Sequence, residues 1–236
     1  MLWVISNIHF DSGLLKPFLS YYRAKGVDRF ALLSRSDLGN LGADVICHRI
    51  HEEYVSGTRD NELTSWWRRQ HLTTHDWYIP ADLDEFFWTP GFKSFKDLYG
   101  DWEIIPAKFF DRLAADGKIR DLTDESLDAQ FPLGGSIIKG LCGGCDDKVA
   151  MARGYVYTTS GHHYASGCRK APFSMFCHHF KFGGNNFWQW MRHRESLVNY
   201  CGAKEVAPFL RHYRNHGRIH FVEERFKMIT SPKIGI

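Results

Sequence analysis

The stretch Trp77-Tyr-Ile-Pro-Ala-Asp-Leu-Asp-Glu-Phe-Phe87 decides the fold, because an apolar run ends there in three carboxylates and an aromatic pair follows. Asp82 and Asp84 are two residues apart, so both side chains point the same way on an extended backbone. Neighbouring carboxylates repel each other unless a cation or protons intervene. Both can reach one divalent cation, and that cation could hold a diphosphate. The alternative is a solvated turn or an acid cluster at the start of a helix.

The residues around this stretch predict alternating strands and helices. Buried strands are expected at 2–6 and 30–34, further strands at 44–47 and 77–80, and helices at about 14–25 and 61–73. A strand, a helix and a strand within about thirty residues imply a parallel sheet. The strand at 77–80 then brings Asp82 and Asp84 to the carboxyl edge of that sheet, where open α/β sheets bind their ligands.

The pattern is less regular beyond residue 90. Strands are expected at 102–110, 148–153, 155–159 and 175–181, a loop at 134–144 and a helix at 185–200. The sequence contains no internal repeat, low-complexity segment or linker that would divide it. We therefore expect one domain over residues 1–236, of the α/β class, with a Rossmann-like, mostly parallel central sheet flanked by helices.

Composition excludes several classes of protein. With 44% hydrophobic and 24% charged residues, the chain is typical of folded rather than disordered proteins. The formal net charge of +3 is too small to predict a nucleic-acid partner. No run reaches the roughly 18 to 20 apolar residues of a transmembrane segment, and the first residues lack the basic region of a signal peptide. We therefore expect a soluble, cytoplasmic protein.

The cysteines leave two interpretations open. Cys142 and Cys145 have the spacing of one half of a zinc site, and Cys168 with Cys177 could supply the other half. The second pair lacks the tight spacing of strong zinc motifs. Reduced thiols, buried or in loops, are the alternative.

Asp82-Leu-Asp-Glu-Phe86, after an aromatic-rich strand, resembles the Asp-x-Asp-Glu-Phe signature of glycosyltransferases of the family 2-like and family 92 type. Other blocks resemble the same family in the same order, namely residues 14–22, 26–30, 148–150, 161–163 and 178–181. The likeness spans most of the chain, and the order of the blocks is its specific part. It implies the GT-A fold and transfer of a sugar from a nucleotide-diphosphate sugar to a hydroxyl acceptor, with inversion.

The resemblance also implies a metal site that holds Mn²⁺ or Mg²⁺. Asp84 would be the first metal ligand, and Asp82 would contact the ribose of the donor or the metal through water. A late histidine often completes the metal shell in such enzymes, and His179 or His162 fits that position. Adjacent strand residues point to opposite faces, so only one histidine of each pair is expected to face the site. The alternative for each is an ordinary structural histidine.

An inverting transfer also needs a base that accepts the proton of the acceptor hydroxyl. Asp111, after an apolar run, is the catalytic candidate, and its alternatives are an ion pair with Arg112 or a helix cap. Four basic residues are candidates for binding the anionic donor, with surface charge as their alternative. They are Arg59, Arg68, Lys148 and Lys181.

The sequence leaves the acceptor open among a glycan, a lipid-linked glycan and a small molecule. Two other functions remain. A metal-dependent phosphoesterase would use the same supply of Asp and His side chains. A non-catalytic carbohydrate-binding module would use the aromatic residues, which make up 15% of the chain, because sugar rings stack on aromatic faces.

Overall fold

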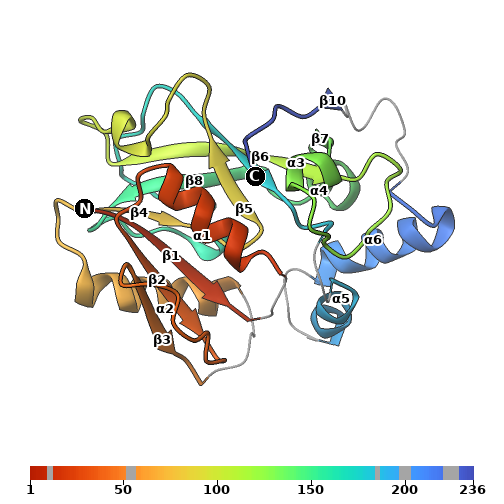
Figure 1. Ribbon diagram of the computed structural model, residues 1–236, viewed down its shortest axis with the longest axis horizontal. Coiled ribbons are helices and arrows are strands. Elements are labelled where there is room, and N and C mark those ends of the chain that lie inside the picture. Colours follow the sequence, from red (N-terminus) through yellow and green to blue (C-terminus); the bar gives the residue numbers. More distant parts are fainter. Residues whose placement is uncertain (10–12, 52–56, 184–186, 197–202, 220–228) are drawn as a thin grey trace.

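The computed structural model (Figure 1) describes residues 1–9, 13–51, 57–183, 187–196, 203–219 and 229–236. Its strands are β1 (Leu2–Ile8), β2 (Arg29–Ser34), β3 (Val45–Arg49), β4 (Trp77–Pro80), β5 (Glu85–Trp88), β6 (Ile104–Leu113), β7 (Leu133–Gly135), β8 (Asp147–Arg153), β9 (Met175–His179) and β10 (Ile229–Thr230). Its helices are α1 (Leu15–Ala24), α2 (Gly57–His71), α3 (Leu127–Gln130), α4 (Ile137–Cys142), α5 (Phe187–Ser196) and α6 (Ala203–His216), with 3₁₀ turns η1 (Phe95–Leu98) and η2 (Ser160–His162).

These strands form one mixed sheet. Its order is β10-β7-β6-β8-β4-β1-β2-β3, and β9 pairs with both β5 and β6. β1 runs parallel to β2 and β4, and β2 runs parallel to β3, so this half of the sheet is parallel as predicted. β8 is antiparallel to β4 and β6, and β7 is antiparallel to β6 and β10. The α/β class is therefore confirmed, with antiparallel ladders added in the second half.

Helices cover both faces of the parallel half. The side chains of β1 alternate, so Leu2 and Val4 join the core under α1, whereas Trp3 packs against Trp67 of α2 with ring centroids 5.2 Å apart. Figure 1 shows α1 crossing the face of the sheet that is turned to the viewer. A third apolar cluster joins α4, α5 and α6 to the end of β6. This cluster lies at the opposite end of the molecule from β3 (Figure 1).

Most predicted elements are present, and two predictions are wrong. Residues 155–159 are not a strand, because Tyr155 lies in a turn and residues 156–159 lead from it into η2. The glycine-rich piece 134–144 is not only a loop, because it contains the end of β7 and all of α4. Gly143 ends α4 in the left-handed region, with φ of 69°. The predicted helix at 185–200 is α5, and residues 185–186 and 197–200 lie outside the described residues.

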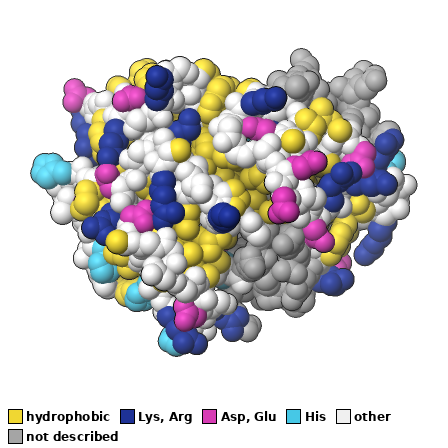
Figure 2. Space-filling view, in the orientation of Figure 1, with side chains coloured by type: hydrophobic (Ala, Val, Ile, Leu, Met, Phe, Trp, Pro, Cys, Tyr) yellow, Lys and Arg dark blue, Asp and Glu magenta, His cyan; other side chains and the backbone are white. Residues whose placement is uncertain are grey.

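The surface carries charges of both signs. On the face shown in Figure 2, Lys and Arg side chains lie interspersed with Asp and Glu side chains around an apolar centre. In the part of the chain that the structure describes, no helix has both the length and the apolar character needed to cross a membrane.

Candidate functional site

The acidic motif lies where the prediction places it, directly after a buried strand. β4 ends at Pro80, and Asp82 and Asp84 occupy the short connection to β5. Because β1 and β4 are parallel, their carboxyl ends meet at one edge of the sheet. Asp82 is exposed there, and 28% of the Asp84 side chain is exposed. A ligand in solution can therefore reach both carboxylates.

A chain of three side chains runs inward from Asp84. The Nε2 atom of His179 lies 3.4 Å from Oδ2 of Asp84, and its Nδ1 atom lies 2.8 Å from Oδ1 of Asp111. The other carboxylate oxygen of Asp111 accepts a hydrogen bond of 2.8 Å from the backbone N–H of Ile138, in the first turn of α4. The strand register produces this chain, because His179 on β9 is paired with Asp111 on β6. His179 is thus held with its Nε2 edge toward Asp84.

The two carboxylates set the protonation of this histidine. Burial alone would lower the pKa of His179, but Asp84 and Asp111 outweigh it and raise the pKa to about 9. Burial would raise the pKa of Asp84, but the charge of His179 outweighs it and the pKa falls below its ordinary value. Lys181 lowers the pKa of Asp84 further. In the metal-free protein, His179 therefore carries a proton at neutral pH and Asp84 is ionised.

This protonation predicts a pH-dependent stability. The pKa of His179 is about 9 in the folded protein and ordinarily 6.5, so its contribution is complete below pH 6.5 and is lost as the pH rises through 9. We expect the free energy of unfolding in EDTA to fall by about 3 kcal/mol over this range. Urea unfolding at pH 6 and pH 9.5 measures it. The fall should be much smaller in His179→Gln, and an equal fall in both proteins would contradict the assignment.

A buried ion pair lies beneath the acidic motif. Nζ of Lys148 on β8 lies 2.7 Å from Oε1 of Glu85, and each side chain is only 2% exposed. The second carboxylate oxygen of Glu85 accepts a hydrogen bond of 3.1 Å from the backbone N–H of Asp82. Burial raises the pKa of Glu85 to about 7, against the opposing effect of Lys148. Glu85 and Lys148 therefore fix the backbone from which Asp82 extends.

A second histidine–aspartate pair, His9 with Asp60, lies at the same edge and was not predicted from the sequence. Nε2 of His9, just after β1, lies 2.7 Å from Oδ1 of Asp60 in the first turn of α2. Burial raises the pKa of Asp60, and the charge of Asp82 adds to the effect. Asp60 and Asp82 are therefore close enough to interact. The signal was present in the sequence, since His9 follows a buried strand whose carboxyl end had to meet that of β4.

Part of a metal-ligand set is present. Asp84 and His179 offer one carboxylate oxygen and one imidazole nitrogen side by side, with Asp82 two residues away on the exposed connection. Within the described ranges, no group of three or more His, Cys, Asp or Glu side chains is already arranged to hold a metal ion. Mg²⁺ is usually bound by one or two carboxylates, with water and substrate phosphates completing its shell. The side chains present fit a metal that arrives with a diphosphate.

The other predicted histidine lies elsewhere. His162 is buried in η2, where its Nδ1 atom lies 2.8 Å from the hydroxyl oxygen of Thr158. Its φ of 57° is in the left-handed region, which is uncommon for residues other than glycine. The structure therefore joins His179, and not His162, to the acidic motif.

Arg68 was predicted to bind the donor, but the structure places it at the opposite edge of the sheet. It is buried, donates to the backbone carbonyl of Gly154 and stacks on Tyr78, with 5.9 Å from its guanidinium carbon to the ring centre. Gly154 follows β8, whose end pairs with Trp77 at the start of β4. The acids follow the other end of β4. Arg68 is therefore a structural residue of the α2 interface.

The three remaining basic candidates lie on the side of the acids. Arg59 in the first turn of α2 is 2.8 Å from Glu62, and both side chains are largely exposed. Lys181 follows β9, and its positive charge lowers the pKa of Asp84. Lys148 is too deeply buried to contact a donor directly, so its contact with Glu85 gives it a supporting position.

Asp111 does not have the surroundings of a catalytic base. It lies within β6 rather than after it, is 1% exposed, and both its carboxylate oxygens accept hydrogen bonds. The alternative of an ion pair with Arg112 is also wrong, since Arg112 pairs with Asp128 at 2.9 Å. A group that must touch an acceptor cannot be buried behind His179. The geometry instead favours a role in orienting His179.

The cysteines that were candidates for a zinc site are free thiols, either buried or nearer the surface. Cys177 is fully buried in the core beneath α1, whereas Sγ of Cys145 lies 3.1 Å from the hydroxyl oxygen of Tyr164 near the surface. The two predicted halves of a zinc site therefore do not come together.

No protein-family model matches the chain, and a search of curated proteins finds no significant match.

Proposed function

We propose that the protein is a metal-dependent glycosyltransferase with a GT-A-like domain. It would move a sugar from a nucleotide-diphosphate donor to a hydroxyl acceptor with inversion at the anomeric carbon. The proposal rests on one observation, the pairing of Asp84 with His179 at the carboxyl edge of a parallel sheet, where open α/β sheets bind nucleotides. The order of the sequence blocks, which includes both residues, supports it.

In this proposal, some residues of the site bind the metal and the donor, and others hold those residues in position. Asp84 and His179 would hold Mn²⁺ or Mg²⁺, which neutralises the negative charge that develops on the departing diphosphate. Asp111 keeps the imidazole of His179 turned toward Asp84, as partners of metal-binding histidines commonly do. Asp82 extends from the exposed connection toward the ribose or the metal, and the pair Glu85–Lys148 fixes its backbone.

In the transfer, the hydroxyl oxygen of the acceptor forms a bond to the anomeric carbon of the donor. The bond between that carbon and the diphosphate oxygen breaks, and its electron pair leaves on the diphosphate. The hydroxyl proton goes to a base, and Asp111 is too deeply buried to be that base. Lys181, whose charge lowers the pKa of Asp84, would favour binding of the anionic donor.

Ligand-dependent thermal stability tests the proposal. A ligand that binds only the folded protein raises the unfolding midpoint by mass action. We expect UDP or GDP to raise the midpoint with Mn²⁺ and to have little effect in EDTA. The absence of any nucleotide-dependent shift across UDP, GDP, ADP and CDP would contradict the proposal.

The same protein sample can distinguish the transferase from the two other candidate functions. A phosphoesterase would release phosphate or a nucleoside monophosphate from the donor faster than it transfers sugar. A carbohydrate-binding module would bind sugars without any dependence on nucleotide or metal.

Asp111→Asn tests the orienting role. Asparagine keeps the size of the side chain but removes the charge that holds the His179 imidazole in place. We expect the Mn²⁺ affinity to fall by roughly ten- to a hundred-fold, which is typical when an outer partner of a ligand is lost. Isothermal titration measures this affinity. A purely structural role would leave the affinity of the folded variant near that of the parent, and it would also leave the alkaline loss of stability unchanged.

A further inference from the structure

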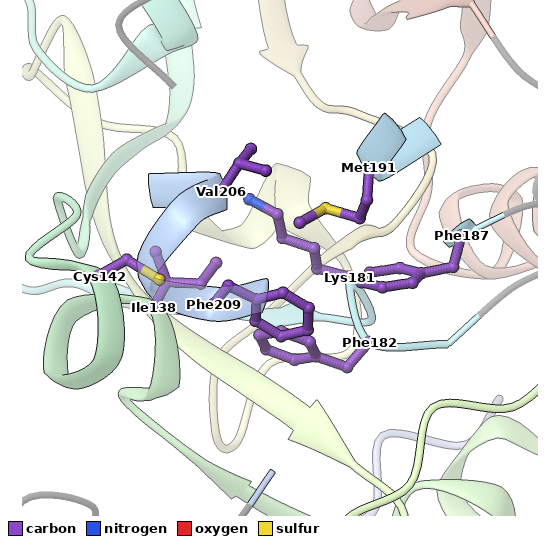
Figure 3. Close-up of a pocket in the computed structure, with 8 residues that line it drawn as sticks. All are labelled: Ile138, Cys142, Lys181, Phe182, Phe187, Met191, Val206 and Phe209. Atoms are coloured by element: carbon purple, nitrogen blue, oxygen red, sulfur yellow. The ribbon is translucent and has the colours of Figure 1, made fainter. Parts of the chain in front are cut away.

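The small apolar space between α4, α5 and α6 (Figure 3) does not offer an acceptor site. Figure 3 shows the side chain of Lys181 running along this space, with its amine toward Val206. The space has a volume of about 20 Å³, which is room for about one water molecule. A sugar ring does not fit in it. Exposed side chains near the acidic motif are the better candidates for contact with an acceptor.

Tyr164, which lies just after η2, exposes its ring while its hydroxyl contacts the protein. The residue is 53% exposed, and its hydroxyl oxygen lies 3.1 Å from Sγ of Cys145. A surface tyrosine more commonly turns its polar tip to water and covers its ring. With the hydroxyl of Tyr164 in contact with Cys145, ring carbons must make up much of the exposed area. The ring can therefore bind an apolar face of a ligand.

The backbone of Tyr164 belongs to a tightly closed loop. Its N–H donates to the hydroxyl oxygen of Thr159 at 3.0 Å, and the N–H of Thr159 donates to the carbonyl oxygen of Tyr164 at 2.7 Å. Gly161 and His162, which lie between them, have left-handed φ values of 65° and 57°. This conformation is uncommon for histidine and persists only where the surroundings determine it. A ring on such a loop loses little conformational freedom when it binds a ligand, which favours affinity.

A row of ring contacts connects Tyr164 to the candidate metal site. The ring centroid of Phe109 on β6 lies 4.7 Å from that of His179 and 6.2 Å from that of His163. The ring centroid of His163 lies 6.4 Å from that of Tyr164. Phe109 and His163 are half-buried, so a ligand can reach part of each. Because Nε2 of His179 is 3.4 Å from Asp84, this aromatic row of Phe109, His163 and Tyr164 begins beside the proposed metal ligands.

The strand directions also place the aromatic row at the edge of the sheet that carries the acids. β8 is antiparallel to β4, so β8 begins at the edge where β4 ends. Nδ1 of His163 lies 2.6 Å from the carbonyl oxygen of Asp147, the first residue of β8. Tyr164 contacts Cys145, two residues before that strand. The aromatic row and the acidic motif therefore lie at the same edge.

Charged side chains that follow Cys145 or face it from β6 and α4 balance each other. Lys108 pairs with Asp147, and Nζ of Lys139 lies 2.8 Å from Oδ2 of Asp146. The side chains of Lys108, Lys139 and Asp147 are accessible to solvent. Ammonium groups donate hydrogen bonds and carboxylates accept them, so these groups can bind hydroxyl groups. Their balanced charge favours an uncharged ligand over an ionic one.

We propose that Phe109, His163 and Tyr164 form a subsite for the sugar residues of an uncharged glycan acceptor. The inference rests on the proposed transferase function and names the acceptor class for it. A pyranose ring has an apolar C–H face, which stacks on an aromatic ring, and hydroxyl groups at its rim, which bond to polar neighbours. A protein partner would need an interface of roughly 1,000 Å² or more, whereas a sugar ring needs only one exposed aromatic ring.

In this arrangement one sugar residue stacks on Tyr164, and the glycan extends along Phe109 toward His179. Its terminal hydroxyl then lies near the donor that the metal holds. The aromatic row thus orients the acceptor and takes no part in the bond changes of the transfer.

Saturation-transfer NMR on the full chain tests the subsite with neutral oligosaccharides. The probes are maltotriose, cellotriose, triacetylchitotriose, mannotriose, xylotriose and N-acetyllactosamine, each measured alone and then with UDP and Mn²⁺. We expect at least one of them to bind with a dissociation constant in the millimolar range. No saturation transfer to any probe under either condition would overturn the inference.

Two alanine variants locate the bound sugar. Tyr155 is the matched control, because it is 48% exposed, its hydroxyl donates to Glu103 at 2.6 Å, and it follows the opposite end of β8. We expect Tyr164→Ala to weaken binding by about three- to ten-fold, as the loss of one aromatic contact would, and Tyr155→Ala to leave it unchanged. Tyr164→Phe keeps the ring and should bind nearly as the parent does. Equal binding by folded Tyr164→Ala and Tyr155→Ala proteins would place the sugar elsewhere and overturn the inference.

Hydroxyl-radical footprinting of the parent decides the question if Tyr164→Ala does not fold. The bound oligosaccharide should protect the side chain of Tyr164 from oxidation and leave that of Tyr155 unprotected. Protection of neither tyrosine, or of Tyr155 alone, would contradict the proposed subsite.

Nucleotide binding in the same samples separates this inference from the proposed function. If UDP binds with Mn²⁺ and no oligosaccharide binds, the subsite inference fails and the transferase proposal stands. If an oligosaccharide binds at Tyr164 and no nucleoside diphosphate binds, the subsite is supported and the transferase proposal fails.

Discussion

Asp84→Asn is expected to abolish Mn²⁺-dependent nucleotide binding without unfolding the protein. The substitution preserves the shape of the side chain, and a side chain that is 28% exposed can hydrate the new amide. It removes the charged oxygen that lies 3.4 Å from His179, and with it the only carboxylate in contact with the Nε2 edge of that ring among the described residues. Loss of an outer partner alone typically costs ten- to a hundred-fold in metal affinity, so loss of a ligand should cost roughly a hundred-fold or more.

Isothermal titration of UDP in the presence of Mn²⁺ measures the effect, and circular dichroism checks the fold. Asp101→Asn is the matched control, because Asp101 is exposed in the turn before β6 and the charge change is the same. The control should bind UDP as the parent does. Parent-like binding by a folded Asp84→Asn protein would remove Asp84 from the metal site and leave the acidic motif without its proposed function.

The sequence predicted the parallel half of the sheet correctly, because the signals for these strands lie within short stretches of the chain. The strands at 2–6, 30–34 and 77–80 are short apolar runs with clear boundaries, and a right-handed strand–helix–strand unit leaves little choice for their pairing. Asp82 and Asp84 then had to lie at the carboxyl edge. This part of the site follows from neighbours in the sequence.

The inner part of the site depends on pairings between distant segments. Asp111 meets His179 only because β9 returns parallel to β6 with one particular register. A shift of one residue would turn His178 to Asp111 instead, since neighbouring side chains point to opposite faces. His178 in fact lies on the other face, 3.1 Å from Arg112. No local pattern fixes that register, so the sequence could nominate Asp111 but gave it the wrong surroundings.

The positions of the basic residues also could not be predicted from local sequence patterns. Arg68 and Arg59 are both on α2, but they lie at opposite ends of the helix and therefore near opposite edges of the sheet. Charge alone could not distinguish them, whereas the direction of the helix does. Lys148 was chosen because it lies in a matching block, and the structure gives that position a different use, in a buried ion pair with Glu85.

Lys148→Met is expected to lower the free energy of unfolding by about 3–5 kcal/mol at pH 7, the cost typical of breaking a buried ion pair from one side. Glu85 is 2% exposed and would lose its only cationic partner at 2.7 Å among the described residues. The variant would relieve this by keeping Glu85 protonated when folded, so its pKa would rise above the present value of about 7. The parent already bears the cost of a raised pKa up to about pH 7, so the further rise in the variant should enlarge its deficit as the pH increases above 7.

Urea unfolding of parent and variant at pH 7 and pH 9 measures both effects, and two further variants isolate the pair. In the double variant Lys148→Met/Glu85→Gln neither member of the pair is charged, so we expect most of the lost stability to return. Lys108→Met is the matched control. It removes a lysine from β6 that pairs with Asp147, but the Lys108 side chain is 51% exposed and surface pairs contribute at most about 1 kcal/mol. If Lys148→Met and Lys108→Met cost the same, the pair beneath the acidic motif is solvated, and the backbone of Asp82 is held in some other way.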